Sequence, residues 1–259
     1  MKSSIYLHDG SFEGILSAVA FAVKSGESVQ GIYDEKSYSA QLFDMVVRVP
    51  TDSLQAEKLF SYLKNLGEYA VQFTINGFLG EERAVGFHLY QMVRLCLRHG
   101  ARALELYSDD SIRYLSQLSR RVNGEAHRLS GLIRFRELKE DIYYAPFESD
   151  CNVIGYLARH FSCRMGSRQW ILHDVGRNIS LHWDGSKVQS IEVDSAFTDY
   201  VLENGEAPDT HLGNTEQYYQ QLWQSFHATI ANPDRENRKL QRQLMPKRYW
   251  QYLVEMRGN

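Results

Sequence analysis

Residues 232–250 combine basic and aromatic side chains in a way that suits contact with a nucleic acid. The segment NPDRENRKLQRQLMPKRYW holds six Lys or Arg residues against Asp234 and Glu236, in a chain of formal net charge −3. Guanidinium and ammonium groups pair with phosphates, and Tyr249 and Trp250 carry rings on which bases can stack. The pattern therefore predicts a localised anion-binding surface near this end of the chain.

A helix is expected to present these charges. Asn232 is a suitable N-cap and Pro233 a suitable first helical residue. Three arginines then recur at spacings of three and four residues, which places them on one helix face, and two further basic residues follow Pro246. The alternative is a solvated helix face beside a Tyr-Trp pair that completes the core. The predicted phosphate-binding residues are Arg235, Arg238, Arg242, Lys247 and Arg248.

A predicted hairpin at residues 170–185 carries residue types that can bind a divalent metal. If its turn is centred on residues 177–178, two histidines face each other across the strands, each followed closely by an aspartate. A change of register would separate the histidines, and the spacing matches no standard metal motif. Polar strand residues are therefore the preferred interpretation, and we expect no metal and no other cofactor. The candidate ligands are His173, Asp174, His182 and Asp184.

Signals for enzymatic chemistry are otherwise weak. Glu125 and His127 could form an acid–base pair, but no third group can be identified; contact of His127 and Arg128 with a nucleic acid is the other functional interpretation. The chain has no GxSxG, P-loop, dinucleotide-type glycine or HExxH motif. Its three cysteines show neither CxxC nor CxxxCxxC spacing, so an iron–sulfur cluster of the radical-enzyme kind is not expected. We therefore favour a protein without intrinsic catalysis.

Composition indicates an ordinary soluble protein. Of 259 residues, 43% are hydrophobic and 24% charged, and no apolar run approaches the roughly 20 residues that span a bilayer. The first residues lack the apolar core of a signal peptide. We expect a cytoplasmic protein that does not associate with membranes.

The hydrophobic periodicity predicts an α+β fold in two parts. A small N-terminal α/β part, residues 1–79, contains strands near 5–7 and 43–49 and helices near 11–26 and 51–67. Residues 80–259 begin with helices up to residue 123 and continue as a helix-flanked antiparallel sheet with a helical C-terminus. Strands are expected at 132–136, 142–145, 169–174, 179–183 and 188–193, with a helix at 152–161. A last long helix carries an apolar stripe, expected to lie in the core, of Tyr219, Leu222, Trp223, Phe226 and Ile230.

Several short motifs run over nearly the whole chain, beginning with Tyr6 and Asp9-Gly10-Ser11-Phe12-Glu13-Gly14. The remaining motifs are His127-Arg128, Gly131, Arg134-Phe135, His160-Phe161, Arg164, Trp170, His182-Trp183-Asp184-Gly185, Asn232-Pro233, Met245-Pro246 and Tyr249-Trp250. Together they resemble a bacterial family linked to DNA repair or DNA metabolism, and the C-terminal run is the most specific part of the resemblance.

The resemblance implies a pathway and no established catalytic residues. In that family the region from about residue 80 is a domain of unknown function, fused in some members to a uracil-DNA glycosylase-like module. Stand-alone members, which this chain resembles, are encoded beside a radical S-adenosylmethionine (radical SAM) protein thought to act on DNA.

The leading hypothesis is therefore a DNA-binding accessory protein in base repair or modification, with DNA and a radical SAM protein as partners. The C-terminal basic residues would contact phosphates, Tyr249 or Trp250 would stack on a base, and a second basic group would complete the groove. That second group is His127, Arg128, Arg134, Arg164 and Arg177. One alternative is a metal- or His-dependent enzyme acting on DNA or RNA. Another is a protein–protein scaffold anchored by Tyr249 and Trp250.

Overall fold

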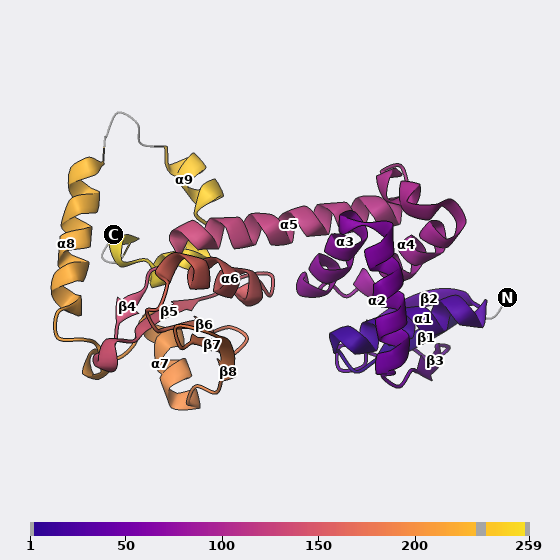
Figure 1. Ribbon diagram of the computed structural model, residues 1–259, viewed down its shortest axis with the longest axis horizontal. Helices are drawn as coiled ribbons and strands as arrows, with labels where there is room; N and C mark the ends of the chain where they lie inside the picture. Colours follow the sequence, from indigo (N-terminus) through magenta and orange to yellow (C-terminus); the bar gives the residue numbers. More distant parts are fainter. Residues whose placement is uncertain (1–2, 232–236, 257–259) are drawn as a thin grey trace. The chain divides into compact units, whose positions relative to one another are not determined.

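The computed structural model describes residues 3–231 and 237–256 and divides the chain into two compact units (Figure 1). Met1–Asn123 form the N-terminal unit and Gly124–Asn259 the C-terminal unit. Both units combine helices with a small sheet, so the predicted α+β class is confirmed. The boundary predicted between residues 79 and 80 lies well before the division between these units. None of the helices in the described ranges is long and apolar enough to cross a membrane.

The N-terminal unit is built around three parallel strands in the order β2-β1-β3. Helices connect or cover them. The elements are β1 (Ser3–His8), α1 (Phe12–Ser25), β2 (Ser28–Asp34), β3 (Met45–Arg48), α2 (Ser53–Leu66), α3 (Glu68–Leu79), α4 (Val85–His99), a 3-10 helix at Gly100–Glu105, and the first part of α5 (Asp110–Leu132).

Local sequence signals explain most of this unit. Ser11 caps α1, because its hydroxyl accepts a hydrogen bond from the Gly14 amide, and Gly26 ends the helix in the left-handed region at φ 66°. Asp52 caps α2 in the same way. Side chains of consecutive β1 residues are buried, as expected for a central parallel strand. These features confirm the four predicted elements, but the observed order is strand, helix, strand, strand, helix, because β2 was not predicted.

β2 was not predicted, because it lies at the edge of the sheet and its sequence shows little alternation of apolar and polar residues. Its sequence SVQGIYD buries only Gly31 and Ile32. Close packing by α4 explains this burial. A Cβ added to Gly86 of α4 would lie 2.6 Å from the carbonyl oxygen of Ile32.

The C-terminal unit contains a five-stranded sheet in the order β4-β5-β6-β7-β8. It comprises the end of α5, β4 (Arg136–Glu137), a 3-10 turn at Lys139–Asp141, β5 (Tyr143–Phe147), α6 (Ile154–Met165), β6 (Trp170–Asp174), β7 (Ile179–Trp183), β8 (Val188–Ile191), α7 (Ser195–Asn204), a 3-10 turn at Asp209–His211, α8 (Glu216–Ile230), α9 (Arg238–Leu244), and 3-10 helices at Lys247–Tyr252 and Val254–Met256.

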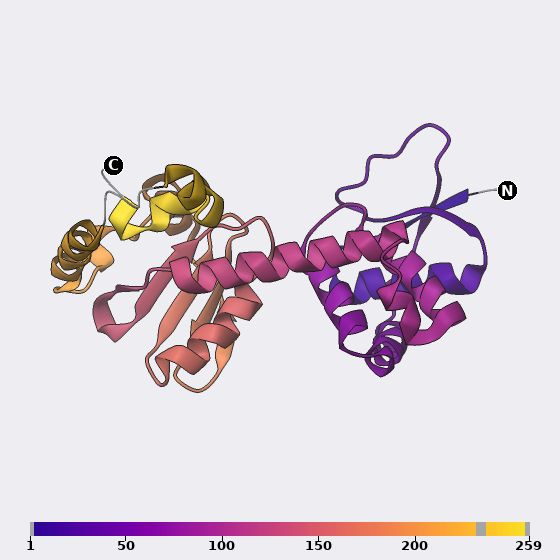
Figure 2. The same ribbon diagram turned by 90° about the horizontal axis from the view of Figure 1, so that it is seen from above.

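The sheet is mixed, whereas the prediction was an antiparallel one. β5 and β6 are parallel, with Tyr143 opposite Trp170, and the other neighbouring pairs are antiparallel. The reason is α6, which lies between these two strands in sequence and returns the chain to the starting edge. α6 contacts β6 and β7 (Figure 2), and its Phe161 reaches the ring of Phe135 beside Trp170. On the other face, Phe197 of α7 packs edge-on against Tyr144.

α5 is longer than predicted, and the strand expected at residues 132–136 is almost absent. The helix continues to Leu132 despite two glycines, because Val122, Glu125 and Leu129 are buried at helical spacing. Only Arg136 and Glu137 pair as a strand, with β5. Tertiary packing therefore overrides the local strand preference of this segment.

Candidate nucleic-acid interface

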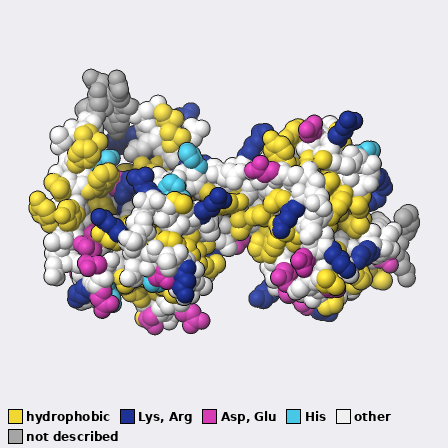
Figure 3. Space-filling view, in the orientation of Figure 1, with side chains coloured by type: hydrophobic (Ala, Val, Ile, Leu, Met, Phe, Trp, Pro, Cys, Tyr) yellow, Lys and Arg dark blue, Asp and Glu magenta, His cyan; other side chains and the backbone are white. Residues whose placement is uncertain are grey.

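The apolar stripe of α8 is exposed, although the sequence pattern predicted that it would lie in the core. Trp223 is 39% exposed and Phe226 51%, and other large side chains of the helix are at least as accessible. Figure 3 shows hydrophobic side chains on the surface over this helix. These exposed residues are Tyr218, Tyr219, Leu222, Trp223, Phe226 and Ile230. The stripe was found in the sequence, but its helical spacing was wrongly assigned to packing against the core.

A groove of about 890 Å³, which we call the aromatic groove, lies beside this helix within the C-terminal unit. Arg134 and Phe135, which follow α5, and Arg164, near the end of α6, form the other side of it. Its lining also includes Tyr219, Trp223 and Phe226. The structure thus brings two predicted binding residues, Arg134 and Arg164, to the same groove as exposed aromatic rings.

Glu255 holds the centre of this groove in place. Its side chain is almost fully buried and accepts hydrogen bonds from Arg134 Nη2 at 2.6 Å and from Trp223 Nε1 at 2.9 Å. The Arg134 guanidinium also lies 5.3 Å from the centre of the Trp223 ring, in cation–π contact. Trp223 and Arg134 are therefore oriented before any ligand binds, and the charge of Arg134 is largely neutralised by Glu255.

Arg164, unlike Arg134, contributes a positive charge to the groove that is not neutralised by a neighbouring carboxylate of the described residues. It is exposed and, within the described ranges, no ion pair engages it. Arg242 and Lys247 are likewise exposed and form no ion pair with described residues. Exposed, unpaired cations are better placed than buried ones to contact phosphate, since little has to be broken.

Arg128 and Arg248 instead surround Glu125, which is 1% exposed. Arg128 Nη2 lies 2.7 Å from one carboxylate oxygen, and Arg248 Nη2 lies 2.9 and 3.0 Å from the two oxygens. Arg248 also pairs with Asp150. Burial by itself would raise the pKa of Glu125, but hydrogen bonds from Tyr249, Arg248 and Arg128 outweigh it and lower that pKa. These two arginines therefore stabilise the fold.

Tyr249 is buried, so the predicted stacking on a base is not available to it. Only 2% of its surface is exposed, and its hydroxyl accepts a hydrogen bond from Arg248. Burial and its contact with Glu125 raise the pKa of its hydroxyl. Trp250 is partly exposed and donates to the Met245 carbonyl at 2.9 Å. The same burial removes Tyr249 from the surface that the scaffold hypothesis assigned to it.

The remaining predicted binding residues are scattered. Arg177 pairs at 2.9 Å with the fully buried Asp174 and donates to the Ser149 carbonyl, so it supports the sheet. His127 is exposed on α5. Arg238 and Arg242 share a face of α9, which begins at Arg238 with Asn237, and not the predicted Asn232, as its N-cap. Asn232, Pro233 and Arg235 lie outside the described residues.

The four metal-ligand candidates do not come together. His173 pairs with Ser180 and His182 with Ile171, because the four-residue turn is centred one residue earlier than predicted. His173 is buried and bonded to Tyr144, and burial lowers its pKa. Asp184 caps its own turn by accepting amide hydrogen bonds from Ser186 and Lys187. In residues 3–231 and 237–256, no three His, Cys, Asp or Glu side chains are grouped to hold a metal ion.

Acid should destabilise the C-terminal unit through Glu125 and Glu255. For Glu255 as for Glu125, burial would raise the pKa, but the bonds from Arg134 and Trp223 lower it below the usual 4.5. At a given pH in this range the unfolded chain therefore binds more protons than the folded chain. The contribution of these two carboxylates to the free energy of unfolding is complete above about pH 5, and it is lost as the pH falls through 4.5 toward their lower pKa values in the folded protein. Denaturant titrations at several pH values would measure this loss. The free energy of unfolding of Glu255→Gln should fall less steeply with decreasing pH than that of the wild type, whereas that of Glu203→Gln, an exposed control, should follow the wild type.

Comparison with known proteins identifies the larger part of the chain. No curated protein matches it significantly. A family model described as a domain of unknown function, DUF4130, matches residues 83–255. The match contains the whole aromatic groove and begins within the N-terminal unit, just before α4. Because this match covers well over half of the sequence, the chain belongs to the DUF4130 family.

Proposed function

We propose that this protein binds single-stranded nucleic acid through the aromatic groove of its C-terminal unit. The observation that carries the proposal is the exposure of Trp223 and Phe226 beside Arg164 in a groove of about 890 Å³. Proteins that bind single strands combine aromatic rings, on which bases stack, with basic groups that follow the backbone. A duplex keeps its bases stacked on one another, so its bases could not use these rings without unpairing.

The residues of the groove differ in the part of a nucleic acid that they could contact. Trp223, held by Glu255, offers a fixed ring, and Phe226 and Tyr219 extend the apolar surface along α8. Arg164 would contact a phosphate. Arg242 and Lys247, also exposed on this unit, would add to the attraction of the chain for a polyanion. This assignment replaces Tyr249 with Trp223 as the principal stacking residue.

Within this proposal the protein acts as an accessory factor in DNA base repair or modification, and a radical SAM enzyme carries out the chemistry. Support for the pathway comes from the sequence motifs that resemble a DNA-metabolism family. Support for an accessory role comes from the groove itself, whose aromatic rings and arginines suit binding.

A protein partner is the second candidate occupant of this groove. The exposed rings of α8 form the kind of apolar patch that protein interfaces use, and Arg134 and Trp223 are residue types typical of such anchors. The two functions differ in salt dependence. Phosphate contacts weaken steeply as salt rises, whereas burial of an apolar helix face persists.

Arg164→Gln should reduce both the affinity for a single-stranded oligonucleotide and its dependence on salt. Loss of one phosphate contact lowers the slope of log K against log salt by about 0.7 for a single strand. Fluorescence anisotropy with a labelled oligonucleotide at several salt concentrations measures this slope for DNA and RNA alike. Arg98→Gln changes an exposed arginine of the N-terminal unit and serves as the matched control. Equal slopes for both variants and the wild type would remove Arg164 from the interface.

A further inference from the structure

The N-terminal unit contains a separate cavity of about 290 Å³ at the carboxyl ends of β1 and β2. The segment after β1, which leads into α1, and the beginning of α4 close it. In parallel sheets, ligands bind outside the carboxyl ends of the strands where the strand order reverses. Here the chain passes from β1 to β2 on one side and then to β3 on the other, so β1 lies at such a point.

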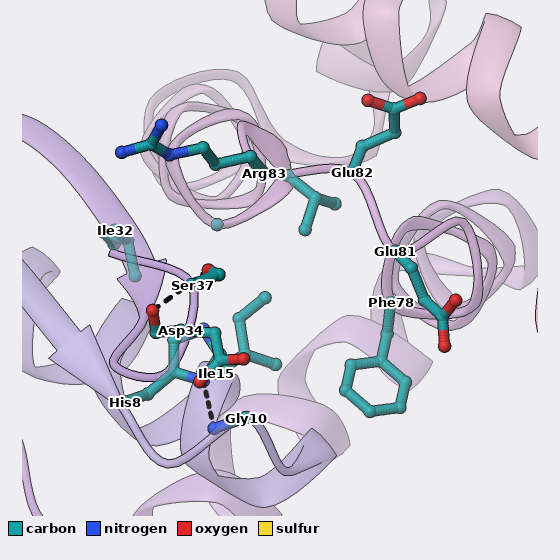
Figure 4. A pocket seen from close by; sticks show the side chains of 12 residues that line it. His8, Gly10, Ile15, Ile32, Asp34, Ser37, Phe78, Glu81, Glu82 and Arg83 are labelled. Carbon is teal, nitrogen blue, oxygen red and sulfur yellow. Dashed lines mark hydrogen bonds between the residues drawn. The ribbon is translucent and has the colours of Figure 1, made fainter. Parts of the chain in front are cut away.

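Two polar side chains at the strand ends of the cavity, Asp34 and His8, are available to a ligand (Figure 4). Asp34, the last residue of β2, accepts a hydrogen bond from the Lys36 amide with one carboxylate oxygen, and no described residue donates a hydrogen bond to the other. Gly10 lets this carboxylate approach the segment after β1. A Cβ on Gly10 would lie 3.1 Å from Asp34 Oδ1, and its φ of 85° also disfavours a side chain.

His8 is the second available group. It is 94% buried, and its Nδ1 accepts a hydrogen bond from the Gly10 amide at 3.1 Å, which places the proton of the neutral ring on Nε2. Burial lowers the pKa of His8, although Asp34 and Asp9 oppose the shift, so the neutral ring is favoured. Nε2 makes no hydrogen bond with the described residues, so the cavity, which His8 and Asp34 both line, offers a ring N–H donor and a carboxylate acceptor.

The rest of the lining limits the kind of ligand. Ile15, Ile32, Phe78 and Val85 give apolar walls that suit a flat ring. Glu82 points away from the cavity in Figure 4 and pairs with Arg121 at 2.6 Å. The Arg83 guanidinium lies over the ring of Tyr33. The volume of about 290 Å³ lies just below the range of about 300–1,000 Å³ for ligand pockets, so a small ligand is favoured.

We propose that this cavity binds a ribonucleoside. The ribose hydroxyls would donate to Asp34, the position at the end of the second strand where nucleotide-binding sheets hold ribose. The base would lie against the apolar walls, and His8 would donate to an oxygen or nitrogen of the ligand. This site is independent of the proposed nucleic-acid groove and requires no residue of the C-terminal unit.

Calorimetric titration of the full chain with adenosine, guanosine, cytidine and uridine at millimolar concentration tests the proposal. At least one should bind saturably. Its 2′-deoxy counterpart should bind about tenfold more weakly or worse, because a charge-assisted hydrogen bond is lost. Asp34→Asn, which can still accept the Lys36 amide, should reduce affinity at least about tenfold, whereas Glu105→Gln, an exposed control, should not.

Three outcomes would overturn the proposal. They are no binding of any of the four nucleosides, equal affinity for the ribo and deoxy forms, and loss of binding in Trp223→Ala, which would place the nucleoside in the aromatic groove. The ribo–deoxy comparison uses the wild-type chain and therefore holds even if Asp34→Asn fails to fold. Oligonucleotide affinity is measured separately, so failure of either proposal leaves the other testable.

Discussion

Replacement of Phe226 or Trp223 by alanine should weaken single-strand binding more than any other change to the groove. Stacking of one base on an aromatic ring contributes about 1–3 kcal/mol, which corresponds to a fall in affinity of about 5- to 150-fold. Phe226 is the cleaner test, because the residue is 51% exposed and its ring carries no hydrogen-bonding group. Anisotropy titrations with one labelled oligonucleotide would give the affinity of each variant.

Trp223 needs a paired variant, because its indole also donates to Glu255. Trp223→Phe loses this bond and has a smaller ring but keeps an aromatic face, so it should bind more tightly than Trp223→Ala. Tyr107→Ala is a matched control, since Tyr107 is exposed in the N-terminal unit. Unchanged affinity in Phe226→Ala and Trp223→Ala, with binding still present, would rule out base stacking in this groove and favour a protein occupant.

Glu125→Ala should be among the most destabilising single changes in the C-terminal unit. It would leave Arg128 and Arg248 without their shared carboxylate. Breaking a buried ion pair costs about 3–5 kcal/mol, and we expect about 3 kcal/mol, because the two arginine side chains are 34% and 33% exposed and water can partly solvate them. Chemical denaturation at neutral pH, followed by circular dichroism, would measure the loss.

Two comparisons make this prediction specific. Glu203→Ala removes an exposed carboxylate of α7 and should change the free energy of unfolding by less than about 0.5 kcal/mol. Glu125→Gln keeps the shape and some hydrogen bonds, so its loss should be intermediate. If Glu125→Ala were as stable as Glu203→Ala, the cluster around Glu125 would not support the fold, and Arg128 and Arg248 would again be candidates for phosphate contact.

Elements with strong local signals could be predicted from the sequence. Ser11 with Gly26, and Asp52 with Gly67, mark the two ends of α1 and α2, and alternating residues mark β6 and β7. The parallel pairing of β5 with β6 was missed, although the helix expected at residues 152–161 indicated it, because two neighbouring strands of one sheet that are joined through a helix are usually parallel. β2 has no comparable local signal, since its stability comes from β1 and α4.

The sequence shows that this chain is rich in arginine but does not show which arginines face solvent. Arg134 and Arg164 are both near the ends of helices and look equivalent in sequence, yet one is paired with Glu255 and the other is exposed. Glu255 lies 121 residues from Arg134 along the chain. Such a partner cannot be inferred from spacing, because only the fold brings the two side chains within hydrogen-bonding distance.

The stripe of α8 illustrates the same limit. Periodicity shows that Tyr219, Trp223 and Phe226 share one helix face, because that depends only on 3.6 residues per turn. Whether another element covers that face depends on long-range packing, and here part of it borders a groove. The sequence alone established an α+β chain with basic, aromatic-rich segments. Burial of Tyr249 and exposure of Trp223, which define the candidate site, arise from contacts between residues distant in sequence.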